Sequence, residues 1–252
     1  IIPPMAKVLF SKKWADWVPI YAWVIEHEEG IIVVDTGETY KTSLKGYLPK
    51  GHPYYALAVD FDVKPEDEIG PQLLNMGIDP KKDVDKVVLT HLHTDHAGGL
   101  HHFPNADILI ERNEYKKASG LKGILAGYLP HRWPKWLQPT LIDLPESPYS
   151  SFDRSLSVTK DGKVIIVATP GHVANHISVI VEMDEVYYFL AGDTSYTQEN
   201  LLNKLPDGIG TKESIQTLEN ILAFSRENPT IYLPSHDPLI PERMKNKEVI
   251  HW

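Results

Sequence analysis

His91-Leu92-His93-Thr94-Asp95-His96 is the stretch that decides the fold. It follows the apolar run Val87-Val88-Leu89 and leads into Ala97-Gly98-Gly99-Leu100, so a short buried strand ends in four potential metal ligands within six positions. Imidazole and carboxylate groups are ligands that borderline divalent metals accept. The stretch therefore predicts a catalytic metal site at the end of a strand.

Three further predicted strands also end in a turn that carries a potential ligand. The turns read Ala168-Thr169-Pro170-Gly171-His172, Leu190-Ala191-Gly192-Asp193 and Leu233-Pro234-Ser235-His236. Taken alone, a histidine at 172 or 236 is more often a capped loop residue than a ligand. The repetition favours one shared site, which we expect to be assembled along one edge of a sheet.

Short β-branched runs between turn residues predict buried strands, and amphipathic stretches between them predict helices. One helix is expected over Glu213–Arg226, after an N-cap at Thr211, and another from Pro65 to about Met76, stopping at Gly77. Such alternation implies layers of sheet covered by helix. The expected strands are Ile31–Val34, Val87–Leu89, Ile108–Ile110, Val164–Val167, Val186–Leu190 and Ile231–Leu233.

Composition narrows the class of protein. A chain of 252 residues without a linker or a charge run favours a single domain over residues 1–252. No apolar stretch approaches the roughly 20 residues of a membrane span, and a net charge of −9 argues against nucleic-acid binding. The absence of cysteine leaves only nitrogen and oxygen ligands for a metal. A cytoplasmic location is expected, although an export signal could have been trimmed from the start.

The segment from Leu121 to Phe152 stands apart, because it combines aromatic residues with five prolines and lacks a clean period. It is expected either to be a surface excursion packed by its own aromatics, or to form a pocket wall or an oligomer contact.

These motifs resemble the metallo-β-lactamase superfamily over nearly the whole chain. The matching pieces are Val34-Asp35-Thr36-Gly37, the His91–His96 cluster, Thr169-Pro170-Gly171-His172, Gly192-Asp193 and Ser235-His236. The resemblance implies an α+β fold, a four-layer αββα sandwich with a dinuclear centre between the sheets. It also implies the ligand sets: His91, His93 and His172 for one metal, Asp95, His96 and His236 for the other, and Asp193 together with a hydroxide as the bridge.

Within the superfamily the chain is most similar to the N-acyl-homoserine lactonases, the quorum-quenching branch. Three stretches carry this resemblance: Pro19-Ile20-Tyr21-Ala22-Trp23, Asp193-Thr194-Ser195-Tyr196-Thr197-Gln198-Glu199-Asn200, and Ser235-His236-Asp237. It implies hydrolysis of a lactone by attack of a metal-bridging hydroxide, with Tyr196 contacting the carbonyl. Asp95 is expected to relay the proton to the leaving alkoxide. Thr94 stands where these lactonases often have an aromatic residue.

Other residues receive more limited expectations. Asp35 is expected either to orient a metal ligand without binding the metal itself, or to be a plain turn aspartate. The aromatic residues Trp14, Trp17, Trp23 and Phe61 are candidates for the substrate pocket, although packing on the core is slightly favoured for Trp23. His101 and His102 are expected to be carried away from the cluster by a helix after Gly99, and His176 is expected to cap local backbone.

The cofactors expected are two divalent ions, with zinc first and cobalt, iron or manganese as alternatives. The family resemblance suggests a homodimer, and the substrate partner is a small lactone. Alternatives on the same scaffold are a glyoxalase II-like thioesterase, a phosphodiesterase or another lactone hydrolase. A flavodiiron protein normally has a carboxylate ligand inside the cluster and a flavin domain, neither of which appears here. A non-catalytic binding module comes last.

Overall fold

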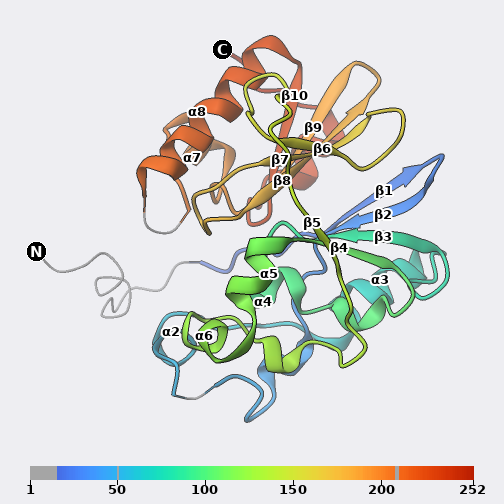
Figure 1. The fold of residues 1–252 in the computed structure, drawn as a ribbon, viewed down its shortest axis with the longest axis vertical. Helices are drawn as coiled ribbons and strands as arrows, with labels where there is room; N and C mark the ends of the chain where they lie inside the picture. The colour runs from blue at the N-terminus through green and yellow to red at the C-terminus, as the bar shows by residue number, and fades with distance from the viewer. Residues whose placement is uncertain (1–15, 50, 208–209) are drawn as a thin grey trace, which may run out of the picture.

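The computed structural model describes residues 16–49, 51–207 and 210–252. Two sheets lie against each other and carry helices on their outer sides (Figure 1). The first half of the chain builds the lower sheet in that view, and the second half builds the upper one.

The first sheet is mostly parallel. Its strands lie side by side in chain order, and only the hairpin of the first two is antiparallel. They are β1 (Trp23–His27), β2 (Gly30–Val34), β3 (Val84–Val88), β4 (Asp107–Glu111) and β5 (Thr140–Ile142).

The second sheet is mostly antiparallel, with the order β10-β9-β8-β7-β6 and a single parallel pair, β9 with β10. Its strands are β6 (Ser155–Ser157), β7 (Val164–Ala168), β8 (Ile177–Met183), β9 (Val186–Gly192) and β10 (Thr230–Pro234).

Short helices connect and cover the strands, and of the helices in the described ranges only α8 is longer than two turns. The α-helices are α2 (Pro53–Leu57), α3 (Ile69–Asn75), α4 (Thr94–Ala97), α5 (Arg112–Ala118), α6 (Gly120–Leu125), α7 (Gln198–Leu202), α8 (Lys212–Glu227) and α9 (Ile240–Asn246). The 3-10 helices are η1 (Tyr40–Ser43), η2 (Pro65–Asp67), η3 (Leu100–His102) and η4 (Pro130–Arg132).

Three apolar cores separate four layers. Successive residues of a strand point to opposite faces, so Val34 of β2 packs between the sheets while Val33 faces the helices on the outer side. Between the sheets, Val34 and Val88 share a core with residues of the second sheet such as Leu190. On the far side of the second sheet, α8 packs through Leu218 and other buried side chains. The expected αββα sandwich is confirmed.

All six expected strands form, and Thr211 caps α8 by accepting a hydrogen bond from the Ser214 backbone. The expected helix from Pro65 to Met76 is wrong in part, because Glu68 interrupts it. Glu68 has an extended backbone, and its carboxylate accepts hydrogen bonds from the Thr39 hydroxyl and the Tyr40 amide. Tertiary contacts of this kind leave no mark on local periodicity.

The aromatic segment from Leu121 to Phe152 is partly core and partly surface. Tyr128 is 1% exposed, and Trp133 stacks on Tyr115 of α5 with ring centroids 5.5 Å apart. In contrast, Leu121 and Leu125 of α6 are about four-fifths exposed. The segment is therefore more than a surface excursion.

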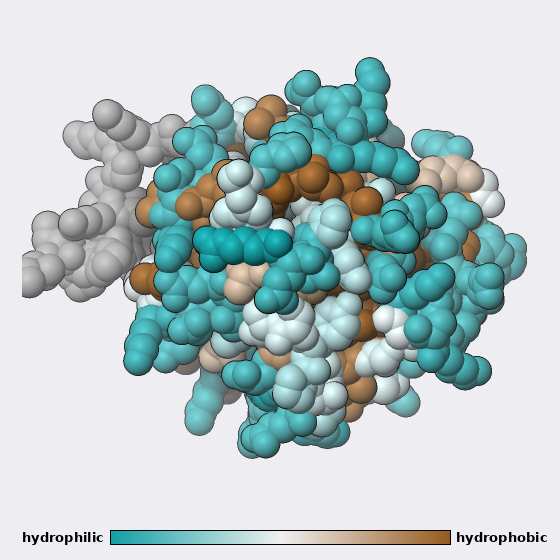
Figure 2. Space-filling model, turned by 90° about the horizontal axis from the view of Figure 1, so that it is seen from above, coloured by the Kyte–Doolittle hydropathy of each residue, from teal (hydrophilic) through white to brown (hydrophobic). Residues whose placement is uncertain are grey.

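Hydrophilic side chains predominate on the face seen in Figure 2, and hydrophobic ones show mainly in the hollows between them. Among the described residues, no helix is both long enough and apolar enough to cross a membrane.

Candidate metal centre

The four ligand-bearing turns meet in space. His91, His93, Asp95 and His96 follow β3, where α4 begins at Thr94. The other three candidates follow strands of the second sheet: His172 after β7, Asp193 after β9 and His236 after β10. The cluster therefore takes candidate ligands from both sheets, as the family resemblance implies, and not from one edge of a sheet.

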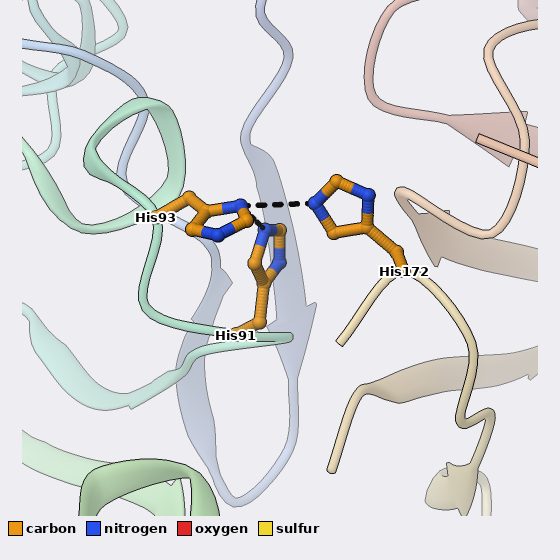
Figure 3. Close-up of side chains that lie close together, drawn as sticks. All are labelled: His91, His93 and His172. Carbon is orange, nitrogen blue, oxygen red and sulfur yellow. Dashed lines mark hydrogen bonds between the residues drawn. The ribbon is translucent and has the colours of Figure 1, made fainter. Parts of the chain in front are cut away.

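Three imidazoles form the first group (Figure 3). Nδ1 of His93 lies 3.0 Å from Nε2 of His91 and 2.9 Å from Nε2 of His172. Burial and the neighbouring histidines hold the pKa of His91 and His93 well below the ordinary value, so both rings are neutral. A neutral imidazole has one nitrogen lone pair to offer, and ring nitrogens of all three histidines face one another here.

The second group consists of Asp95, His96, Asp193 and His236. Nε2 of His96 lies 3.1 Å from Oδ1 of Asp193, and Nε2 of His236 lies 3.3 Å from the same oxygen. Oδ2 of Asp95 is 3.5 Å from Nε2 of His236 and 3.8 Å from Nε2 of His96. The donor atoms of these four residues are thus close enough to share one ion.

Asp193 connects the two groups through its two carboxylate oxygens. Oδ1 faces His96 and His236, whereas Oδ2 lies 3.5 Å from Nε2 of His172 and 3.8 Å from Nε2 of His91. Burial alone would raise the pKa of Asp193, but His96 and His236 outweigh it and hold that pKa well below the ordinary value. An ionised carboxylate that faces both groups suits a bridge between two cations.

The donor set fits divalent ions. Nε2 of His96 and Oδ1 of Asp193 are buried and have no hydrogen-bond partner within the part of the chain that the structure describes. Buried polar atoms normally have partners, so atoms aimed at one another without one fit a place for a cation. All seven candidates are imidazoles or carboxylates, the donors that zinc and related metals accept.

In three of the five candidate histidines, the ring nitrogen that points away from the cluster has a hydrogen-bond partner. Such partners fix the ring and its tautomer, leaving the other nitrogen free to bind a metal. Nδ1 of His96 lies 2.8 Å from Asp35, Nδ1 of His236 lies 2.9 Å from the Pro19 carbonyl, and Nδ1 of His91 lies 3.2 Å from the Thr90 hydroxyl. Nδ1 of His172 is 3.4 Å from the Asp207 carboxylate but makes no hydrogen bond within the described residues.

Residues 15–236 match the family model described as the metallo-beta-lactamase superfamily, which covers most of the chain and both ligand groups. The chain belongs to the metallo-beta-lactamase superfamily.

Within this superfamily the chain is similar to N-acyl homoserine lactonases. It is 29% identical over 229 residues to one from a Bacillus species, covering 87% of this chain and 82% of that protein. It is 26% identical over 227 residues to AttM of Rhizobium radiobacter, covering 88% and 82%. The crystal structure of an AiiA variant of B. thuringiensis, with N-decanoyl-L-homoserine bound at its active site, matches with a TM-score of 0.74 and 25% identity, covering 97% of this chain and 91% of that one.

Tyr196 lies at the rim of the centre, with its ring centroid 5.8 Å from that of His236, and it is 46% exposed. The negative charge of Asp207, burial and the charge of Asp193 all raise its pKa. The phenol therefore keeps its proton at neutral pH and can donate a hydrogen bond at the mouth of the site.

Two supporting residues from the sequence analysis take clear places. Asp35 is fully buried, adopts a left-handed backbone and accepts hydrogen bonds from Thr90 as well as contacting His96. His176 is also buried, and its Nε2 accepts a hydrogen bond from the Asp193 backbone amide. Both side chains thus hold turns that carry candidate ligands. Asp35 orients His96, in agreement with the first alternative, and His176 binds a backbone amide 17 residues away, whereas a local cap was expected.

Sequence reasoning missed three residues beside the centre. Asp207 is 3% exposed and lies next to His172; burial raises its pKa to about 6. Glu38 is 4% exposed and accepts a hydrogen bond from Thr94 between two ligands. Tyr54 of α2 is near enough for Asp95, Asp207 and Asp193 to contribute to its raised pKa, after burial. Two local patterns could have pointed to these residues: the Asp-Thr-Gly-Glu turn for Glu38 and the two tyrosines after Pro53 for Tyr54.

The pocket candidates are dispersed. Trp17 is 68% exposed and lies two residues before Pro19, which contacts His236. Trp23 of β1 packs against the core between the sheets, as the packing alternative expected. Phe61 is half-buried in the loop before η2, where its carbonyl accepts a hydrogen bond from Ser43. Trp14 lies outside the described residues.

Proposed function

We propose that this chain is a dinuclear metal-dependent hydrolase that opens the lactone ring of N-acyl-homoserine lactones, a quorum-quenching activity. The observation that carries the proposal is the Asp193 carboxylate, which faces two groups of ligating side chains beside the phenol of Tyr196. The similarity to N-acyl homoserine lactonases over more than four-fifths of their length supports the substrate class.

The two groups would hold one divalent ion each, with Asp193 shared between them. Zinc is the ion we propose, because seven imidazole and carboxylate ligands without a thiolate suit it, and cobalt, iron and manganese accept the same donors. When bound, a pair of such ions supplies a water nucleophile at neutral pH and polarises an ester carbonyl.

Tyr196 is proposed to stabilise the carbonyl oxygen as negative charge develops on it. Its raised pKa keeps the phenolic proton in place, so the group donates a hydrogen bond throughout the reaction. Its partial exposure leaves the hydroxyl accessible to a substrate that enters from solvent. Loss of this donor should lower turnover by about tenfold to a few hundredfold.

Asp95 is proposed to carry a proton to the departing oxygen of the ring. Its side chain is 22% exposed, in contrast to the fully buried His96, so it borders the space where substrate would lie. Water adds to the carbonyl carbon, the bond between that carbon and the ring oxygen breaks, and the oxygen leaves as an alcohol. The product carboxylic acid then releases one proton to solvent, which makes the reaction measurable with a pH indicator.

The domain organisation, the oligomeric state and the cellular location of the protein are proposed as well. Residues 1–252 are proposed to act as one domain, since both sheets contribute ligands to the same cluster. We further propose a homodimer in the cytoplasm. The exposed side chains of Leu121 and Leu125 in α6 support self-association, because they offer an apolar surface to a second copy. Sedimentation analysis tests whether the protein is a dimer.

The decisive experiment compares substrates with a pH-indicator assay of the zinc-loaded protein. The panel contains acyl-homoserine lactones of graded tail length, a thioester and a phosphodiester. We expect lactones to be hydrolysed well above the other two classes, and a preference for the thioester or the phosphodiester would contradict the proposal.

A matched pair of variants tests whether the activity depends on the Asp193 carboxylate. Asp193→Asn removes the shared charge and should abolish ring opening. Asp184→Asn makes the same change on an exposed turn residue with a left-handed backbone, which asparagine tolerates, and should leave the rate unchanged.

A further inference from the structure

A second group of ligating side chains lies outside the metal centre. Glu68 precedes α3, and His101 and His102 belong to η3. Nε2 of His102 lies 2.5 Å from Oε2 of Glu68, and Nε2 of His101 lies 3.1 Å from the same oxygen. The three ligand atoms all lie within 4.8 Å of one another. The two histidines that follow the catalytic motif therefore converge on a carboxylate of their own.

The hydrogen positions around His101 leave a conflict. Its Nδ1 lies 3.2 Å from the carbonyl oxygen of Gly98, which can only accept, so Nδ1 carries the hydrogen. In the neutral ring the lone pair is then on Nε2, and it faces the lone pairs of Glu68 at 3.1 Å. Two acceptors this close repel each other unless a cation lies between them.

A proton is the weaker candidate for that cation. Burial, His102 and Lys41 together lower the pKa of His101, so the imidazolium form is disfavoured. A divalent metal ion resolves the conflict differently, because it accepts the lone pairs of a neutral imidazole and of a carboxylate at once.

The carboxylate of Glu68 has both the fixed orientation and the negative charge that a metal ligand needs. Its other oxygen, Oε1, accepts hydrogen bonds from the Thr39 hydroxyl at 2.6 Å and from the Tyr40 amide at 2.9 Å, which fixes the carboxylate. Burial alone would raise its pKa, but in the metal-free protein the hydrogen bonds from Thr39 and His102 outweigh it, so the group is ionised. A bound ion would take the place of the hydrogen between His102 and Glu68. Only Oε2 is left to face the two imidazoles.

Gly70 makes room for His102. A Cβ atom at this position would lie only 2.2 Å from Nδ1 of His102, so any side chain there would displace the ring. His101 also borders a cavity of about 320 Å³ that Lys41 and Arg132 line as well, so a water molecule or an anion can reach it. Two imidazoles, one carboxylate and access for an outside ligand make up a frequent arrangement for zinc.

We infer that Glu68, His101 and His102 form a further site for a borderline divalent cation such as Zn²⁺, separate from the seven-residue centre. The ion would tie the turn at Thr39 and the start of α3 to η3, which follows the helix that carries Asp95 and His96. Its expected role is to stabilise this part of the fold.

The test counts ions. Metal-free protein is dialysed to equilibrium against excess Zn²⁺, and zinc per chain is measured by elemental analysis. We expect three ions in the natural chain and two in the double variant His101→Ala, His102→Ala. His251→Ala removes an exposed histidine and should retain three.

A second variant keeps the fold intact at a buried position. In Glu68→Gln the amide oxygen can still accept from Thr39 and Tyr40, and the amide nitrogen can donate to an imidazole lone pair without a metal. This variant should bind two ions and keep its far-ultraviolet circular dichroism. The inference rests on the difference of one ion: equal numbers of ions in the natural chain and in either variant would overturn it.

The result is independent of the proposed function. Lactone hydrolysis should be unchanged in the double variant, because neither histidine belongs to the catalytic centre. A natural chain that binds three ions yet opens no lactone would support this site while contradicting the lactonase proposal.

Discussion

Replacing Asp35 by asparagine tests how the buried support behind His96 contributes to metal binding. Oδ2 of Asp35 lies 2.8 Å from Nδ1 of His96, while Oδ1 accepts hydrogen bonds from the backbone and the hydroxyl of Thr90. Asparagine has one oxygen and one NH₂ group in place of two oxygens. Whichever way the amide turns, it loses an acceptor that the aspartate provides.

The size of the effect follows from the burial of both partners. Asp35 and His96 are each 0% exposed, so water cannot replace the lost bond. A hydrogen bond to a charged group contributes about 1.5–3 kcal/mol, and 1.4 kcal/mol corresponds to a factor of ten. If NH₂ faces Nδ1, the ring must also move its hydrogen to Nε2, the nitrogen that points at Asp193. We therefore expect affinity for the ion between Asp95, His96 and His236 to fall by about ten- to a hundredfold.

The assay is competition for Zn²⁺ with a chromophoric chelator, followed by ring opening at limiting and at saturating zinc. Asp107→Asn makes the same change on an exposed carboxylate that accepts from Thr140, and its affinity should stay within about twofold. The ion between His91, His93 and His172 should remain bound, which shows that the variant is folded. A folded Asp35→Asn variant with both affinities within about twofold of the natural chain would refute the reasoning.

Four further changes probe the centre and its surroundings. Tyr196→Phe should retain both ions yet lower kcat by about tenfold to a few hundredfold, and unchanged turnover would remove the phenol from the mechanism. Trp17→Ala should raise KM for long-tailed lactones more than for short-tailed ones, since the ring is exposed near the centre, and equal effects would exclude it from the acyl site. Burial raises the pKa of Glu38 from 4.5 to about 8, so the folded metal-free protein holds a proton that the unfolded chain has released, and stability falls as the pH rises between these values. Urea unfolding should show that Glu38→Gln weakens this decline, and an unchanged pH profile would contradict the assignment. Gly98→Ala would place a Cβ 2.7 Å from the Thr94 carbonyl and 2.8 Å from the Thr39 amide, so unfolding in urea should show a loss of about 1–3 kcal/mol, whereas equal stability would mean that the turn can shift.

The parts of the fold that the sequence predicts are those in which neighbouring residues share one environment. Strands such as β2 and β7 are buried on both faces, so they appear as continuous β-branched runs. β5 and β6 have three residues each, too few to show a period. The predicted helix at Pro65–Met76 is interrupted because Glu68 bonds to a turn almost 30 residues earlier in the chain.

The candidate ligands could be named in advance because they lie in segments that follow the ends of strands, and strand ends converge. Asp207 and Tyr54 could not, because they come from a loop and a five-residue helix whose positions depend on the completed fold. Trp23 illustrates a different difficulty. An aromatic side chain has the same sequence signature in a pocket wall and in a core, and here it packs between the sheets.

The central claim is that seven side chains from two sheets hold a pair of ions. Anomalous diffraction at the zinc edge from crystals of the zinc-loaded protein tests it most directly. The account predicts one peak bounded by His91, His93 and His172 and a second bounded by Asp95, His96 and His236, with the Asp193 carboxylate between them. A folded, zinc-replete protein with one peak or none in this cluster would contradict it.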